Sequence, residues 1–139
     1  MKKATKLVCV LALVLAVLLS GCERFHFSFT TALNNTKIEV NDAVDGDFAE
    51  SSPISVGKDR VVVVDSALEK GKLKIDFTEA TVFSNEDGPD DVILGDVVAS
   101  VTVGRSGKER LALERGDYVM QIEAIGETDG VVTVNVEKR

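Results

Sequence analysis

The chain has 139 residues, of which 45% are hydrophobic and 28% are charged, and its formal net charge is −7. This length suits one domain with a core of its own. Because a negatively charged chain repels a phosphate backbone, the charge argues against a nucleic-acid partner. One histidine and two cysteines leave few of the ligands that zinc requires.

The first 21 residues have the pattern of an export signal. Lys2, Lys3 and Lys6 give a basic start, and residues 7–19 form an almost unbroken apolar run. The run is too short for a transmembrane helix, which needs about 20 apolar residues. We therefore predict a cleaved signal peptide over residues 1–21.

Small residues lead directly from this run to a cysteine. The sequence Leu19-Ser20-Gly21-Cys22 resembles the lipobox of bacterial lipoproteins. In that family the cysteine thiol receives a diacylglyceryl group, and the peptide bond before the cysteine is cut. The resemblance implies lipidation at Cys22 and a mature protein of residues 22–139, anchored in the cell membrane on its extracytoplasmic face. Two or more acyl chains on one cysteine give stable anchoring.

Removal of the signal would leave the mature protein without a thiol. Cys9 lies within the signal, and Cys22 would carry the lipid. The domain would therefore contain neither a disulfide nor a free cysteine, although export normally permits disulfides. We expect its fold to depend on a hydrophobic core alone.

The chain after Cys22 is patterned for β-strands, because its apolar residues recur with a period of two and are rich in Val, Ile, Thr and Phe. A first hairpin is expected to turn at Asn34-Asn35. Its inner face would carry Phe25, Phe27, Phe29 and Leu33.

Later segments repeat this strand pattern. Residues 41–58 are richer in Asp, Gly, Ser and Pro, and we predict a long loop that contains a short strand. Val61–Val64 would form a strand covered on both faces. Further strands are expected at residues 73–77, 97–103, 111–113, 118–124 and 132–136. Predicted turns are centred on Gly71 and on residues 85–91, 104–107 and 126–130.

Seven or eight short strands, separated by turns roughly every 8 to 12 residues, are typical of an all-β domain. We predict an antiparallel two-sheet β-sandwich of Greek-key or jelly-roll type over residues 22–139. The stretch Leu113-Glu-Arg-Gly116-Asp-Tyr118 and the valine-rich end are similar to the closing strands of fibronectin-like sandwiches and of bacterial prepeptidase C-terminal domains. That resemblance implies a stabilising hydrogen bond from Tyr118 to the backbone.

Catalytic chemistry has little support in the sequence. His26 is the only histidine, lies four residues after the expected anchor, and alternates outward from Phe25 and Phe27. A Ser/His/Asp or Cys/His arrangement is therefore not expected. We predict a protein that is not an enzyme, with no catalytic residue and no cofactor.

Two acidic loops are the candidates for a metal site. One loop contains Asp42, Asp45 and Asp47, and the other contains Glu86, Asp87, Asp90 and Asp91. Calcium takes six to eight oxygen ligands, which flexible acidic loops can supply. Neither loop has the EF-hand spacing, and solvated acidic turns commonly have this composition. We predict no metal ligand, with calcium-dependent adhesion as an alternative.

The remaining function classes are binding and accessory roles in the cell envelope. The whole chain resembles small surface lipoproteins of gut bacteria and other Gram-positive organisms. We expect a membrane contact through the lipid on Cys22 and a partner that is an envelope protein or a glycan. Glycan recognition usually needs exposed aromatic rings, but the chain has no Trp and one Tyr. Carbohydrate binding is therefore the alternative to a protein-binding or accessory module.

Overall fold

The computed structural model describes residues 26–88 and 90–139, and all of its elements are strands. In chain order they are β1 (Phe27–Ala32), β2 (Asn35–Ala43), β3 (Phe48–Glu50), β4 (Ile54–Val56), β5 (Arg60–Phe83), β6 (Asp91–Val103), β7 (Gly107–Leu111) and β8 (Gly116–Lys138). The predicted signal peptide, Cys22 and Phe25 lie outside the described residues. Within the described part, no helix is long and apolar enough to span a membrane.

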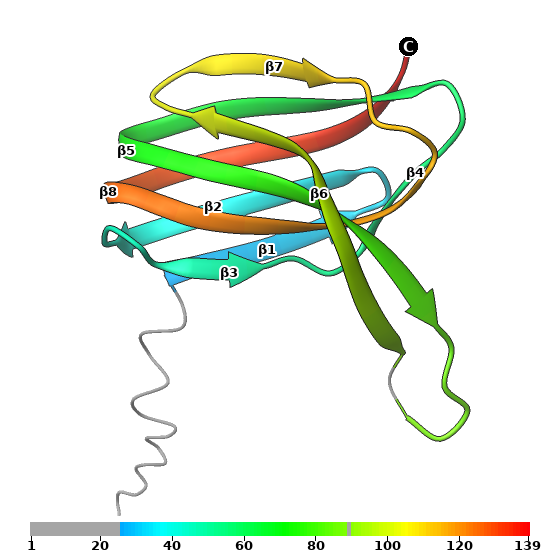
Figure 1. The fold of residues 1–139 in the computed structure, drawn as a ribbon. Coiled ribbons are helices and arrows are strands. Elements are labelled where there is room, and N and C mark those ends of the chain that lie inside the picture. The colour runs from blue at the N-terminus through cyan, green and yellow to red at the C-terminus, as the bar shows by residue number, and fades with distance from the viewer. Residues whose placement is uncertain (1–25, 89) are drawn as a thin grey trace, which may run out of the picture.

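The strands form one antiparallel sheet in the order β1-β2-β8-β5-β6, with β3 and β4 also paired to β8 and β7 also paired to β5. This sheet folds over into two layers, because β5 and β8 each run through both of them (Figure 1). In one layer, the first half of β5 lies between β7 and the second half of β8. In the other, the second half of β5 lies between β6 and the first half of β8. The predicted all-β antiparallel sandwich is confirmed.

Two predicted turns are wrong, because the chain bends there without leaving the sheet. Gly71 lies inside β5, which spans 24 residues, and residues 126–130 lie inside β8, which spans 23. The ladder between these strands runs from Arg60↔Lys138 to Ala80↔Asp117, with register shifts on either side of Lys70. The two layers are therefore halves of the same long strands, where the sequence suggested separate short ones.

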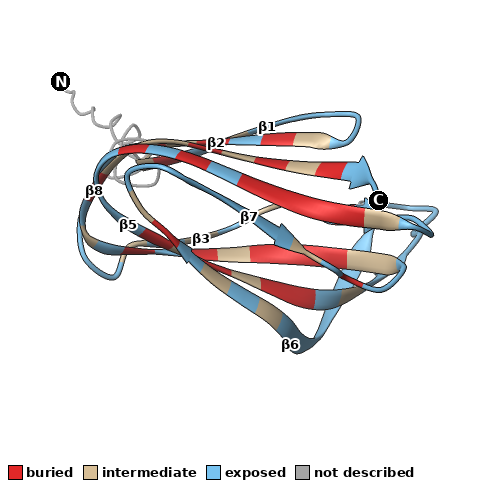
Figure 2. Ribbon diagram, turned by 90° about the horizontal axis from the view of Figure 1, so that it is seen from above, coloured by how far each residue is buried: buried red, intermediate tan, exposed pale blue. Residues whose placement is uncertain are grey.

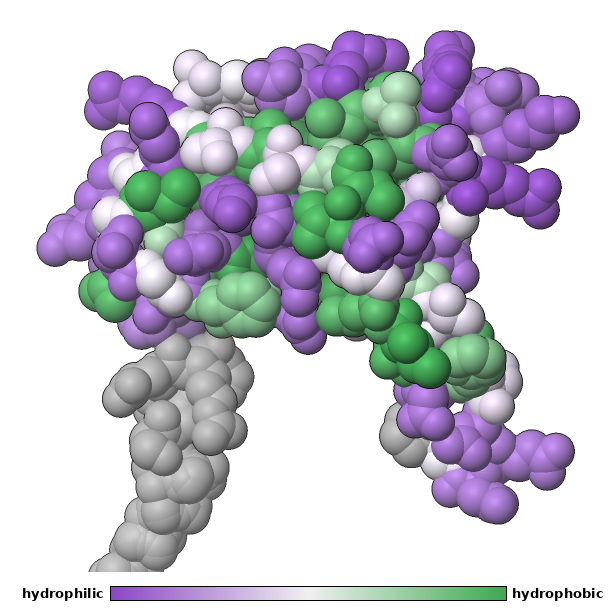
Figure 3. All heavy atoms as spheres, viewed as in Figure 1, coloured by the Kyte–Doolittle hydropathy of each residue, from purple (hydrophilic) through white to green (hydrophobic). Residues whose placement is uncertain are grey.

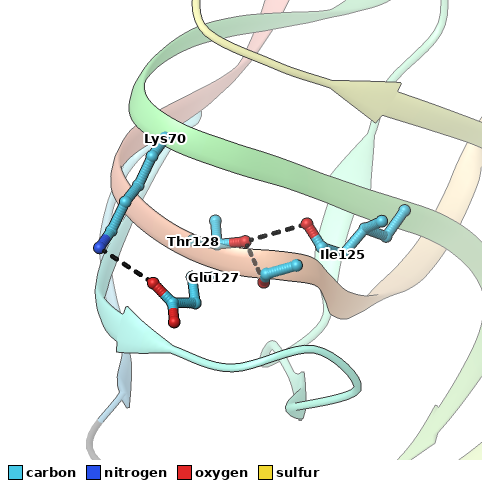
Figure 4. Close-up of polar contacts among 5 residues, drawn as sticks. Lys70, Ile125, Glu127 and Thr128 are labelled. Atoms are coloured by element: carbon cyan, nitrogen blue, oxygen red, sulfur yellow. Dashed lines mark hydrogen bonds and ion pairs between the residues drawn. The ribbon is translucent and has the colours of Figure 1, made fainter.

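Glycines make this bend possible. Gly71 has a φ of 78°, and a Cβ built on it would lie 2.3 Å from the carbonyl oxygen of Glu127. The hydroxyl of Thr128, which is fully buried, donates to backbone carbonyls at the bend, with the Gly126 oxygen at 2.9 Å. Figure 4 shows this hydroxyl together with the ion pair between Lys70 and Glu127 at 3.5 Å. The bend is thus built from close backbone contacts that exclude a side chain at Gly71.

A single hydrophobic core fills the space between the layers, where buried positions of both halves face each other (Figure 2). Val62 and Val64 reach it from the first half of β5, and Ile75 and Phe77 from the second half. All four residues of Val61–Val64 are buried, as the prediction of a strand covered on both faces requires.

The first hairpin differs from its prediction at the turn. Phe27 is buried and Phe29 packs against the core, as expected. Leu33, however, is fully exposed in a two-residue turn with Asn34, where it has a φ of 55°. Turn geometry, and not strand alternation, therefore sets the direction of its side chain.

Tyr118 makes the backbone hydrogen bond that the resemblance implied. Its hydroxyl donates to the carbonyl oxygen of Glu114 at 2.5 Å, and the side chain is buried at the start of β8. Burial, and secondarily the charges of Glu114 and Glu79, raise the pKa of Tyr118 above 10.0. The neutral, hydrogen-bonded side chain of Tyr118 therefore fixes the chain at the start of β8.

Replacement of Tyr118 by Phe is expected to lower the free energy of unfolding by about 1 kcal/mol, because one partly buried hydrogen bond is lost. Ionisation is harder in the folded state than in the unfolded state, so the tyrosine's contribution is complete below pH 10 and is lost as pH rises through the folded pKa. Urea unfolding between pH 8 and 11 should show a steeper alkaline loss for the wild type than for Tyr118→Phe. Equal slopes would contradict this assignment.

Candidate interaction surface

The β5–β6 hairpin extends beyond the two layers as an arm, defined here as residues 79–98. Thr78 is buried and its hydroxyl donates to Gln121 Oε1 at 2.9 Å, which fixes the point where β5 leaves the body. Among the described residues between Thr78 and Val103, none is buried. Figure 1 shows the arm projecting away from the body at the end opposite the bend in β5 and β8, whereas β1 begins at the bend end.

β-Bulges at its base turn the arm away from the body. The ladder pairs Phe77 with Ala99 and Thr78 with Val97, and then Ala80 with Leu94, so β6 carries extra residues at both steps. Extra residues on one strand bend it and increase its local twist. Beyond them the ladder is regular as far as Phe83↔Asp91.

Large apolar side chains of the arm remain 36% to 59% exposed to solvent. Seven large ones are exposed: Val82, Phe83, Val92, Ile93, Leu94, Val97 and Val98. Figure 3 shows hydrophobic residues along the part of the arm nearest the body and hydrophilic residues at its tip. A concentration of exposed apolar surface on one projecting element is typical of an interaction site.

The arm also has charge of one sign. It contains six acidic residues: Glu79, Glu86, Asp87, Asp90, Asp91 and Asp96. No Lys or Arg occurs between Lys74 and Arg105. Four of these carboxylates lie in or beside the turn at the tip, where they give the arm a negative end.

Hollows lie on both sides of the arm where it joins the body. On one side, Val92 and Leu94 face the β3–β4 loop across a cavity of about 250 Å³, which Pro53 and Val119 also line. On the other side, a second cavity of about 250 Å³ lies between Val98 and the ring of Tyr118. The arm therefore offers apolar surface on both of its faces.

The first acidic loop is used for backbone capping. Asp45 Oδ1 accepts a hydrogen bond from the Gly126 amide at 2.8 Å, and Asp47 Oδ2 accepts one from the Val44 amide at 2.9 Å. Asp42 has a φ of 52° at the end of β2. The Asp45 carboxylate therefore connects this loop to the bend in β8, and the Asp47 carboxylate closes the loop on itself, two roles that the sequence did not reveal.

The second acidic loop forms the tip of the arm. Asn85 Nδ2 donates to Asp91 Oδ2 at 3.5 Å across the turn, while Glu86, Asp87 and Asp90 are exposed. Within residues 26–88 and 90–139, no three His, Cys, Asp or Glu side chains gather closely enough to hold a metal ion. The structure therefore does not bring either acidic loop together as a ligand set.

His26, the residue considered for catalysis, makes a contact with the backbone of β2. His26 Nδ1 lies 2.8 Å from the Asn41 carbonyl oxygen, across the β1–β2 hairpin. A cavity of about 200 Å³ beside the β1–β2 turn is lined by neutral residues, including Asn34, Thr36 and Ile54. This lining supplies no group for proton transfer near neutral pH.

Comparisons with known proteins do not assign a family. No family model and no curated protein matches the chain. Among solved structures, a carbohydrate-binding module from Cellvibrio mixtus lichenase 5A, in complex with cellotriose, has 15% identity and a TM-score of 0.36 over 81% of this chain and 86% of the other. Drosophila melanogaster CENP-C bound to CAL1 has 8% identity and a TM-score of 0.34 over 88% and 95%. Likeness at this level does not identify a ligand.

Proposed function

We propose that the chain is a lipid-anchored protein of the bacterial cell envelope, and that its domain is a non-catalytic module that binds an envelope protein through the arm. The observation that carries the binding role is the arm itself, which exposes seven large apolar side chains on an element that leaves the core. The lipobox at Leu19–Cys22 supports the anchor.

The position of the anchor would fix which end of the domain lies close to the membrane. Cys22 precedes the first described residue, His26, by four positions, and an extended chain spans at most about 3.6 Å per residue. A lipid on Cys22 would therefore hold Phe27, the first residue of β1, within roughly 18 Å of the bilayer surface. β1 begins at the bend end of the sandwich and the arm leaves the body at the opposite end, so the anchor would leave the arm at the end of the domain away from the lipid (Figure 1).

Photocrosslinking in the producing cell tests this function. A photoreactive amino acid in place of Ile93, which is 59% exposed on the arm, is expected to form a discrete adduct with one envelope protein. The same residue in place of Val44, which is 53% exposed in the β2–β3 connection, is the matched control and should form no such adduct. Cys22→Ala should remove the adduct by removing the anchor, and mass spectrometry of the mature N-terminus should show a diacylated Cys22.

The carbohydrate alternative gives a different result. Phe48 and Phe83 are the aromatic side chains of the described residues that are most open to solvent, at 57% and 49%, while Tyr118 is buried. Retention on envelope polysaccharide that Phe48→Ala and Phe83→Ala abolish, together with equal crosslinking at Ile93 and Val44, would replace protein binding by glycan binding.

A further inference from the structure

We infer that the partner adds an extended, basic segment as a new strand to the free edge of β6. This inference rests on the proposed function and specifies the chemistry of the partner. It follows from three properties of the arm: the unpaired backbone of β6, the exposed apolar side chains beside it, and the absence of positive charge.

The first property is an open sheet edge. In the described part of the chain, β6 pairs with β5, and no strand pairs with its other side. The backbone amides and carbonyls on that side lack a ladder partner, so they form a template for another strand. Exposed edges are commonly protected by Lys or Pro, but the 13 residues of β6 contain neither.

The second property is a regular stretch of this edge with apolar neighbours. From Ala80↔Leu94 to Phe83↔Asp91 the β5–β6 ladder has no register shift, so an added strand would meet an even spacing of hydrogen-bonding groups. Val92 and Leu94 point to one face of this stretch, and Ile93 to the other. Apolar residues of the added strand would pack beside them in alternation, as in β-strand addition.

The third property selects the occupant. A second copy of the arm would place six carboxylates beside six others without a cation, and like charges on neighbouring strands are destabilising. A bilayer interior would have to accept the charged tip before the apolar part of the arm, which is costly for ionised carboxylates. A strand with Lys or Arg meets neither obstacle, and it supplies the charge that the arm lacks.

The test uses the full lipidated chain in detergent micelles and three labelled ten-residue peptides. One peptide alternates Lys with Val, the second alternates Glu with Val, and the third is the Lys peptide N-methylated at consecutive residues so that neither edge can pair. Fluorescence anisotropy is expected to show at least tenfold tighter binding of the first peptide than of the other two. Its affinity should fall with added salt, and it should protect β6 amides at residues 91–94 from hydrogen exchange.

Matched variants localise the binding. Ile93→Lys should weaken the Lys peptide at least tenfold, and Asp91→Asn with Asp96→Asn should weaken it severalfold. Val44→Lys, at an exposed position away from the arm, should leave it unchanged. Equal binding of the Glu or N-methylated peptide would overturn the inference, as would protection of residues other than those of β6. If any of these results is found together with an arm-specific adduct at Ile93 in cells, the proposed function stands. The inference that the partner adds a basic strand to β6 is then rejected.

Discussion

Alanine at Gly71 is expected to lower the free energy of unfolding by about 2 to 5 kcal/mol, combining about 1 to 2 kcal/mol for a side chain in a left-handed conformation with about 1 to 3 kcal/mol for overpacking. The added methyl would lie 2.3 Å from the Glu127 carbonyl oxygen, and that backbone is fixed within β8. Urea unfolding of the full chain measures the change.

Two other glycines separate these causes. Gly126 has a φ of 74° with no atom within 4 Å of its Cβ position, so Gly126→Ala should show the conformational cost of about 1 to 2 kcal/mol alone. Gly104 has neither a positive φ nor a close neighbour, and Gly104→Ala should change stability by less than about 0.5 kcal/mol. If Gly71→Ala costs no more than Gly126→Ala, the backbones of β5 and β8 do not approach each other at the bend as closely as described.

Phe77→Ala is expected to destabilise the domain by about 3 to 5 kcal/mol, because Phe77 is fully buried in the core between the two layers. Phe83 lies six residues further along the same strand and is 49% exposed on the arm. Phe83→Ala should therefore cost less than about 1 kcal/mol in the same denaturation experiment. Comparable losses for the two variants would mean that the arm packs against the body and is not available to a partner.

Alternation along the chain was sufficient to identify the buried face of individual strands. Leu73, Ile75 and Phe77 alternate with charged residues in the sequence, and all three are fully buried. The continuity of β5 and β8 could not be predicted in this way. A glycine-rich stretch such as residues 126–130 permits either a turn or a bend, and the outcome depends on long-range pairing with residues 68–72.

The arm shows a second limit of periodicity. Val97, Ala99, Val101 and Val103 alternate along the strand predicted at residues 97–103, yet Val97 is exposed and Val103 is buried. Val103 packs in the core between the layers, whereas Val97 lies on the arm, which leaves the core. Which of the two positions is covered depends on the tertiary structure and cannot be deduced from alternation. One feature of the sequence does distinguish the arm from the rest of the chain, because no Lys or Arg occurs between Lys74 and Arg105.

Hydrogen–deuterium exchange on β6 in isolated envelope membranes, compared with the purified full chain, tests most directly whether the arm is a binding surface. The amides of residues 91–94 should exchange at least tenfold more slowly in the membranes, because an attached partner protects them. The β1–β2 turn at Leu33-Asn34 should exchange at the same rate in both samples. Equal exchange of residues 91–94 in the two samples would show that the arm is unoccupied in the envelope and would contradict the proposed function.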